Sequence, residues 1–149
     1  MRSLAEPAFP DDDGQAYAAL EAAFGDDARV LAVLGDVRVF VPVIALLDDI
    51  PADGDKEADM AAVMLTGADG RQALLAFSSV AAMTAWNADA RPVPVWGRQA
   101  ARAALDEGAS AMLLDLTSPT FTVIETADVE HLAAGHRLVD TDAGTAWLT

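Results

Sequence analysis

The chain has 149 residues, no cysteine and a formal net charge of −15, from 24 acidic and 9 basic residues. A surface this negative repels nucleic-acid phosphates and anionic lipid heads, so we expect neither nucleic acid nor a membrane as a partner. A length of 149 residues fits one domain, expected over residues 1–149. The absence of cysteine excludes disulfides and Cys-ligated metal sites and, with no apolar leader after Met1, favours the cytoplasm.

The N-terminal part predicts a lead-in and two helices. Residues 1–12 are rich in proline and aspartate, which opposes regular structure, so we expect an irregular lead-in. Apolar residues at helical spacing then predict a helix over residues 13–24 that ends at Gly25. A second, shorter helix follows, capped by Asp26 or Asp27.

The first predicted strand spans residues 37–46. Its sequence, VRVFVPVIAL, is rich in β-branched residues and apolar on both alternating faces, as in a strand with neighbours on each side. Pro42 lacks an amide donor, so we expect it at a bulge or where the donor side of the strand is unpaired.

Residues 48–59 form a predicted acidic loop. Four of its acidic residues occupy every second position, as the oxygen ligands of a calcium loop do: Asp53, Asp55, Glu57 and Asp59. The glycine and the final glutamate of that motif are replaced here by Ala58 and Met64. We therefore interpret the segment as a solvated acidic turn.

A hairpin followed directly by a helix forms the centre of the predicted fold. Two apolar runs, residues 60–66 and 71–77, are joined through an Asp-Gly turn, which is a strong local signal for a hairpin. Ser78 or Ser79 can then cap a helix over residues 80–86 by accepting a hydrogen bond from a free amide.

The segment after this helix predicts an extended connector and another helix. Pro92 and Pro94 each force the preceding residue out of the helical region, so residues 90–96 should be a stiff, extended connector. Alanine and leucine at helical spacing predict a helix over residues 97–107, ended by Gly108.

The C-terminal part repeats the pattern of strands and helix. Residues 111–116 and 120–125 predict a second hairpin, and residues 127–134 predict a final helix. The tail, residues 136–149, is expected to add a small edge hairpin.

These elements together predict an α+β fold in which a mostly antiparallel mixed sheet of about five strands is covered by four to five helices. We expect one contiguous core that includes eight strand residues: Val39, Val41, Val63, Leu65, Leu74, Phe77, Leu113 and Val123.

The residues capable of catalysis show no familiar arrangement. His131 and His136 are the only histidines, and on a continuous helix they would point about 140° apart, so we do not expect a metal pair. No nucleophile elbow surrounds Ser78, Ser79 or Ser118, and capping or turn formation explains all three. No phosphate-binding glycine motif occurs either. The sequence therefore predicts no catalytic residue, no metal ligand and no cofactor.

One surface is nevertheless a candidate for binding. Trp86 and Trp96 flank the proline-rich connector, and Arg91 and Arg98 bring positive charge to a strongly negative protein. This local reversal of sign would attract a protein partner with acidic residues or a small anionic ligand. The alternative is that both tryptophans are buried and Arg91 pairs with a nearby carboxylate.

A long central stretch carries a family resemblance. The residues KEADMAAVMLTGADGRQALLAFSSVAAMTAW, followed by ARPVPV, resemble the SseB N-terminal-domain family, also called the enhanced serine sensitivity protein family. The VPVIA strand, the D-G-R turn, the F-S-S cap and the stretch EGASAMLLDL add to the likeness, which covers about residues 37–125. The resemblance implies a compact bacterial α+β domain without an established activity, ligand or catalytic residue.

Composition adds a hint of the source. Eight of the nine basic residues are arginine and alanine is very frequent, as in the GC-rich genomes of actinobacteria. Adaptation to high salt would also favour the acidic residues.

We therefore expect a non-catalytic protein- or small-ligand-binding module. The alternative is a small hydrolase or metal-assisted enzyme that uses carboxylates such as Asp59 and Asp115 together with Arg91. A carboxylate with a raised pKa in a pocket would favour the enzyme.

Overall fold

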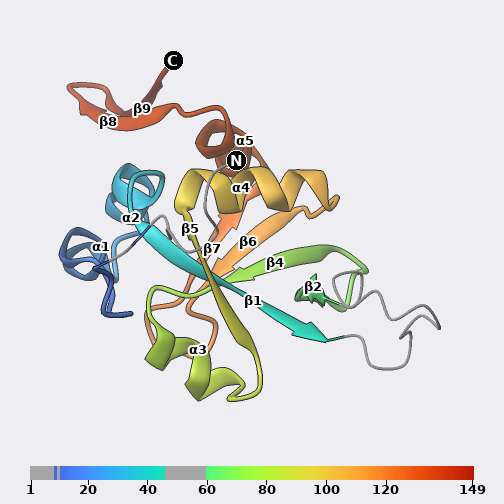
Figure 1. Ribbon diagram of the computed structural model, residues 1–149. Coiled ribbons are helices and arrows are strands. Elements are labelled where there is room, and N and C mark those ends of the chain that lie inside the picture. Colours follow the sequence, from blue (N-terminus) through green and yellow to red (C-terminus); the bar gives the residue numbers. More distant parts are fainter. Residues whose placement is uncertain (1–8, 10, 46–59) are drawn as a thin grey trace, which may run out of the picture.

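The computed structural model describes residue 9, residues 11–45 and residues 60–149 of the chain. In these ranges it contains five helices and nine strands, in sheets of three, four and two strands (Figure 1). The predicted α+β class is confirmed, although the strands are divided among several small sheets instead of one sheet of about five. None of the helices in the described ranges has the length and apolar character needed to cross a membrane.

The elements follow one another in this order: α1 (Ala18–Ala23), α2 (Asp27–Leu34), β1 (Arg38–Ala45), β2 (Met60–Ala62), β3 (Met64–Thr66), β4 (Gln72–Ala76), α3 (Val80–Trp86), β5 (Arg91–Trp96), α4 (Gly97–Asp106), β6 (Ala111–Leu114), β7 (Thr122–Glu125), α5 (Thr126–Ala133), β8 (Arg137–Thr141) and β9 (Gly144–Leu148). The acidic loop predicted over residues 48–59, with its calcium-like spacing, lies outside the described residues.

Helix α1 is shorter than the sequence predicts, because the chain forms turns before it. The side chain of Asp12 accepts a hydrogen bond from the amide of Gly14 at 3.0 Å, and that of Asp13 accepts one from Gln15 at 3.0 Å. Such local bonds compete with a helix, and the positive φ of Gly14 (80°) turns the chain further. The helix predicted from Asp13 therefore begins only at Ala18.

Helices α2 and α3 begin where the capping signals predict. The side chain of Asp26 accepts a hydrogen bond from the amide of Arg29 at 3.3 Å, and that of Ser79 accepts one from Ala82 at 3.0 Å. Each cap satisfies a backbone donor that the first helical turn leaves free.

The predicted strand over residues 60–66 is two strands that serve different sheets. β2 pairs with β1, whereas β3 pairs with β4 in the predicted hairpin. Val63 marks the change, since its amide donates to the carbonyl of Pro42 (3.1 Å) and its own carbonyl accepts from the amide of Leu75 (3.4 Å).

The segment over residues 90–96 is extended as predicted, but it is not merely a connector, because Arg91–Trp96 is strand β5, antiparallel to β1 along its whole length. Pro94 lies opposite Phe40, whose amide and carbonyl both bond to Phe77 on the other side of β1. Pro92 lies opposite Pro42, whose carbonyl likewise bonds to Val63. Both β5 prolines thus occupy positions that need no amide donor toward β1.

The four-stranded sheet runs in the order β3-β4-β6-β7, with β4 and β6 parallel and the outer pairs antiparallel. Helices α4 and α5 lie along one face of it and α3 lies near the opposite side of the fold (Figure 1). The buried side chains under α4 and α5 form the larger of two hydrophobic clusters; those from the sheet are Leu74, Ala76, Met112, Leu114 and Ile124. A smaller cluster packs around Phe77 and Met83 of α3.

The predicted core is right for half of its members. Val39, Val41, Leu74 and Phe77 are buried, while Val63 and Leu113 are half-buried. The prediction that Leu65 and Val123 are buried is wrong, since these residues are 40% and 42% exposed. Leu65 lies opposite Ala73, and Val123 opposite Leu113, so both point to the sheet face away from α4 and α5. The core is also two clusters instead of one.

Helix α4 begins in direct contact with the end of α2. The amide of Gly97 donates to the carbonyl of Val37 at 2.8 Å, and the amide of Arg98 donates to that of Gly35 at 3.3 Å. A Cβ atom at position 97 would lie only 1.8 Å from the carbonyl oxygen of Leu34.

The tail forms the predicted hairpin, with β8 antiparallel to β9, but as a separate two-stranded sheet instead of at the edge of a larger one. It lies beyond α5 and beside α2 in Figure 1. The expectation that His131 and His136 point apart is wrong, because α5 ends at Ala133 and the chain reverses at Gly135. Their Nδ1 atoms lie 2.9 Å from each other.

Candidate functional site

The four residues of the predicted binding surface lie at the two ends of β5. Trp86 ends α3 and stacks on Phe77, with ring centroids 5.5 Å apart, and Arg91 is exposed at the start of β5. Trp96 ends β5, about 17 Å of extended strand from Arg91. Arg98 is near Trp96, with its guanidinium 5.8 Å from the indole centroid. The structure therefore brings Trp96 and Arg98 together and leaves the other two at the far end.

Arg98 already has partners in the protein. Its Nη1 atom lies 3.6 Å from the carboxylate of Asp36 and donates to the carbonyl of Gly35 at 3.3 Å. Both Arg98 and Asp36 are largely exposed, so this pair contributes little to stability. The idea that the four residues form one ligand surface stays a prediction.

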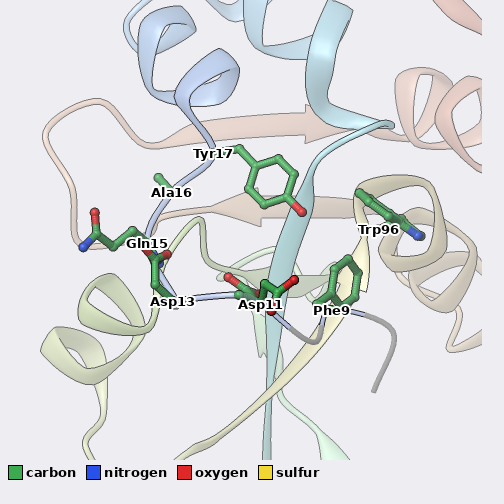
Figure 2. Close-up of a pocket in the computed structure, with 8 residues that line it drawn as sticks. Phe9, Asp11, Asp13, Gln15, Ala16, Tyr17 and Trp96 are labelled. Atoms are coloured by element: carbon green, nitrogen blue, oxygen red, sulfur yellow. The ribbon is translucent and has the colours of Figure 1, made fainter. Parts of the chain in front are cut away.

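A cavity of about 460 Å³ lies beside Trp96 and is formed mainly by N-terminal residues that precede α1. Figure 2 shows Phe9, Tyr17 and Trp96 on one side of it. Trp96 makes edge-to-face contacts with Phe9, at a centroid distance of 4.8 Å, and with Tyr17, at 6.3 Å. Two aromatic rings of the N-terminal segment thus meet Trp96, from the end of β5, at one cavity.

Three consecutive carboxylates, Asp11, Asp12 and Asp13, also line this cavity. The turns around Gly14 hold them there, because Asp12 and Asp13 bind the amides of Gly14 and Gln15. Asp11 and Asp13 are exposed, whereas Asp12 turns partly inward. The cavity therefore combines aromatic walls with negative charge.

Asp12 is paired with a completely buried arginine, Arg38. The Nε atom of Arg38 lies 2.6 Å from one oxygen of Asp12, and its Nη2 atom lies 2.8 Å from the other. The guanidinium also lies 4.2 Å from the ring centroid of Phe40 and 5.1 Å from that of Tyr17. The hydrogen bond from Arg38 lowers the pKa of Asp12 below its ordinary value of 3.8, against the opposing effect of partial burial.

The same arginine connects to a second buried carboxylate through Ser78. Arg38 Nη1 donates to the carbonyl of Ser78 at 2.8 Å. Ser78 in turn donates from its amide (2.8 Å) and its hydroxyl (2.6 Å) to the two oxygens of Asp115. We call Asp12, Arg38, Ser78 and Asp115 the Arg38 cluster. It joins the lead-in, β1 and the ends of β4 and β6.

Asp115 was a candidate for the enzymatic alternative. Burial raises its pKa above the ordinary value, although the hydrogen bonds from Ser78 lower it. Both of its oxygens are bound by Ser78, and the residue is only 5% exposed, so its carboxylate faces the protein interior. Asp59, its suggested partner, lies outside the described residues.

Metal ligands do not gather in the part of the chain that the structure describes, since no three His, Asp or Glu side chains lie close enough to hold an ion.

Sequence reasoning missed the aromatic and acidic cavity and the Arg38 cluster. One available signal was Arg38 itself, a charge inside the apolar run VRVFVPVIAL that requires a buried partner if the strand is covered on both faces. A second was the run Asp11–Asp13, which supplies such a partner. Neither signal identifies Trp96 or Tyr17 as neighbours of that run.

In a comparison with protein families, the model of the SseB protein N-terminal domain matches residues 14–131. The matched range includes Tyr17 and Trp96, but not Phe9, the three aspartates or the C-terminal hairpin. Comparison with curated proteins gave no match, and comparison with solved structures gave none either.

Proposed function

The chain belongs to the SseB N-terminal domain family, and from this premise we propose that it acts as a non-catalytic binding module in the bacterial cytoplasm. The observation that carries the proposal is the cavity of about 460 Å³ walled by three aromatic rings and lined by three aspartates. Its volume is in the range of ordinary small-ligand pockets.

The chemistry of the cavity favours a cationic group, such as the ammonium or guanidinium end of a small molecule or of a partner side chain. Aromatic faces attract cations through their electron-rich rings, and quaternary ammonium groups are often recognised by several such rings together. Asp11 and Asp13 add negative charge at the opening, while Asp12 is neutralised by Arg38. The high negative charge of the whole chain would also draw a cation toward it.

The residues around this cavity support binding over catalysis. Its described lining consists of aromatic, acidic, glutamine and alanine side chains, without a serine, lysine or histidine to serve as nucleophile or as its base. Asp115, the carboxylate with a raised pKa, has both oxygens bound to Ser78.

A second candidate is the anionic ligand or acidic partner expected from the sequence, at Trp86, Arg91, Trp96 and Arg98. Two observations favour it: Arg91 is exposed at the edge of the sheet, and Arg98 places a positive charge beside Trp96. The two candidates demand ligands of opposite charge, so they can be separated by experiment.

The test uses choline and its uncharged carbon isostere, 3,3-dimethyl-1-butanol, titrated into the full chain and followed by NMR signals of the indole of Trp96. Choline is expected to bind at least about fivefold more tightly, because one cation–π contact contributes about 1 kcal/mol. The double variant Asp11→Asn with Asp13→Asn should weaken choline binding by a similar factor. Asn at position 13 still accepts the bond from Gln15.

A matched control removes the same charge elsewhere. Asp89→Asn with Asp106→Asn changes two exposed carboxylates outside the cavity and should leave choline binding within about twofold of wild type. Equal binding of choline and its isostere, or equal loss in both double variants, would remove the proposal. Binding of inorganic phosphate that disappears in Arg91→Gln with Arg98→Gln would instead support the second candidate.

A further inference from the structure

The chain leaves α5 through a turn that brings two histidines together. The amide of Gly135 donates to the carbonyl of Leu132 and that of His136 donates to the carbonyl of His131, both at 3.0 Å. With a φ of 81° at Gly135, these bonds form a Schellman motif, the usual left-handed end of a helix. The reversal places Nδ1 of His136 2.9 Å from Nδ1 of His131.

The other strand of the hairpin meets the same histidine. The indole of Trp147, in β9, stacks on the ring of His131 with a centroid distance of 4.7 Å and an interplanar angle of 11°. Its Nε1 atom also donates to the carboxylate of Asp128 on α5, at 3.3 Å. His131 therefore contacts both the entry to the hairpin and its second strand.

We propose that His131 and His136 form a pH-sensitive latch that holds the hairpin β8–β9 on α5 near neutral pH and releases it in acid. A hydrogen bond between two Nδ1 atoms needs one of them to be without a proton, whichever ring is the donor. When both rings are imidazolium, both Nδ1 atoms are donors, and two positive charges face each other across the former bond.

The charges around His136 do not offset a second proton. The small cavity beside it is lined by Asp36 of α2, Arg98 of α4 and Arg137 of β8. Among the described residues that line this cavity, Asp36 supplies the carboxylate. Its oxygens already lie 3.6 Å from Nη1 of Arg98 and 3.5 Å from Nη2 of Arg137. An imidazolium at position 136 therefore adds to positive charge that Asp36 must already balance.

The charges around His131 differ. Glu130 is exposed beside it on α5, and Asp128 accepts the bond from Trp147. An imidazolium at position 131 also gains from stacking on the indole. With one of the two rings protonated, a donor and an acceptor still face each other and the latch stays closed; with both rings protonated, it opens.

Besides α5, the hairpin also packs against α2, which β8 contacts. A two-stranded hairpin is at best marginally stable by itself in water, so its order depends on packing against a neighbour. Leu138 is buried, but β9 is exposed apart from the half-buried Trp147. The hairpin also lies outside the range matched by the family model.

The test measures amide hydrogen exchange of the full chain at about pH 7.5 and about pH 5, either side of the ordinary imidazole pKa. After correction for intrinsic rates, protection of β8–β9 amides is expected to fall at least about tenfold in acid, while β4 and β6 amides stay within about twofold. His136→Asn keeps a donor and an acceptor near the Nδ1 position but takes no proton, so its hairpin should stay protected at both values.

His136→Phe provides the opposite reference. It removes the bond at every pH, so its hairpin should show low protection already at about pH 7.5 and little further loss in acid. The latch is disproved if wild type keeps its protection at about pH 5. It is equally disproved if His136→Asn loses as much protection in acid as wild type, because the acid effect then arises from other groups.

Discussion

The interior of the protein has two parts that are stabilised differently. Under α4 and α5 the sheet residues Leu74, Met112, Leu114 and Ile124 form an apolar core without charged members. At the start of β1, the Arg38 cluster buries the guanidinium of Arg38 and the carboxylate of Asp115, which are connected through hydrogen bonds to Ser78.

The two parts should differ in how much stability a single substitution removes. Apolar packing is non-directional, so removing one side chain loses its own contacts and creates a cavity, while its neighbours remain satisfied. In the Arg38 cluster each member is the partner of another, so one deletion leaves a buried polar or charged group without a bond. The cluster should therefore be the more sensitive of the two, residue for residue.

Asp12→Ala is expected to give the largest effect. The substitution leaves the completely buried guanidinium of Arg38 without its carboxylate, and breaking a buried ion pair in this way costs about 3 to 5 kcal/mol of unfolding free energy. Denaturant unfolding of wild type and variant measures the loss.

The neighbouring residue supplies the control. Asp13→Ala removes an exposed carboxylate whose bond is a local turn contact to Gln15, so the loss should stay below about 1 kcal/mol. If both variants lose the same amount, the pairing with Arg38 does not account for the sensitivity of Asp12.

Leu74→Ala tests the apolar core, with a loss of about 2 to 5 kcal/mol for a fully buried leucine. Leu65→Ala, in the neighbouring strand, should lose less than about 1 kcal/mol because its side chain is 40% exposed. Unfolding in urea compares the two. A loss at Leu65 as large as that at Leu74 would mean that the open face of the sheet is covered in solution.

The smallest expected effect concerns the two carboxylates of the Arg38 cluster, whose contributions to stability should depend on pH in opposite directions. The pKa of Asp12 is lowered in the folded state, so its stabilising effect is present above the ordinary value of 3.8 and is lost as the pH falls below it. The pKa of Asp115 is raised, so its contribution is complete below 3.8 and is lost as the pH rises through the raised pKa.

Asp115→Asn should therefore unfold with a free energy equal to or slightly above that of wild type at neutral pH, and the difference should shrink as the pH falls toward 3.8. Asn also tolerates the positive φ of 57° at this position. The pH profile of thermal unfolding measures this change, with Leu74→Ala as a variant whose loss should be independent of pH. An Asp115→Asn variant that is less stable at neutral pH than in acid, relative to wild type, would contradict the sign.

The most reliable predictions from the sequence were those that depend on local signals. Asp26 and Ser79 cap helices as predicted, because a cap needs only a side chain and an amide a few residues away. Gly108 and Gly135 end helices with positive φ for the same local reason. The histidine pair was missed although the final helix was predicted to end at residue 134, since the angle between the rings was taken from a continuous helix.

Long-range relations could not be obtained in this way. Leu65 and Val123 belong to strands that are apolar on both faces. The alternation of side chains along such a strand shows which residues share a face, but it does not show which face the helices cover. Likewise, residues 12, 38, 78 and 115 share no local pattern, and only the folded chain brings them together. The candidate cavity likewise depends on a long-range contact, between the N-terminal residues and Trp96 at the end of β5.

The contact between α2 and α4 has a consequence for how this chain can vary. At position 97 even a methyl group would overlap the backbone of Leu34, and a backbone oxygen cannot turn aside as a flexible side chain can. In a library that carries all twenty amino acids at this position, selection for folded protein should therefore return glycine alone, whereas the exposed neighbour Arg98 should accept many replacements.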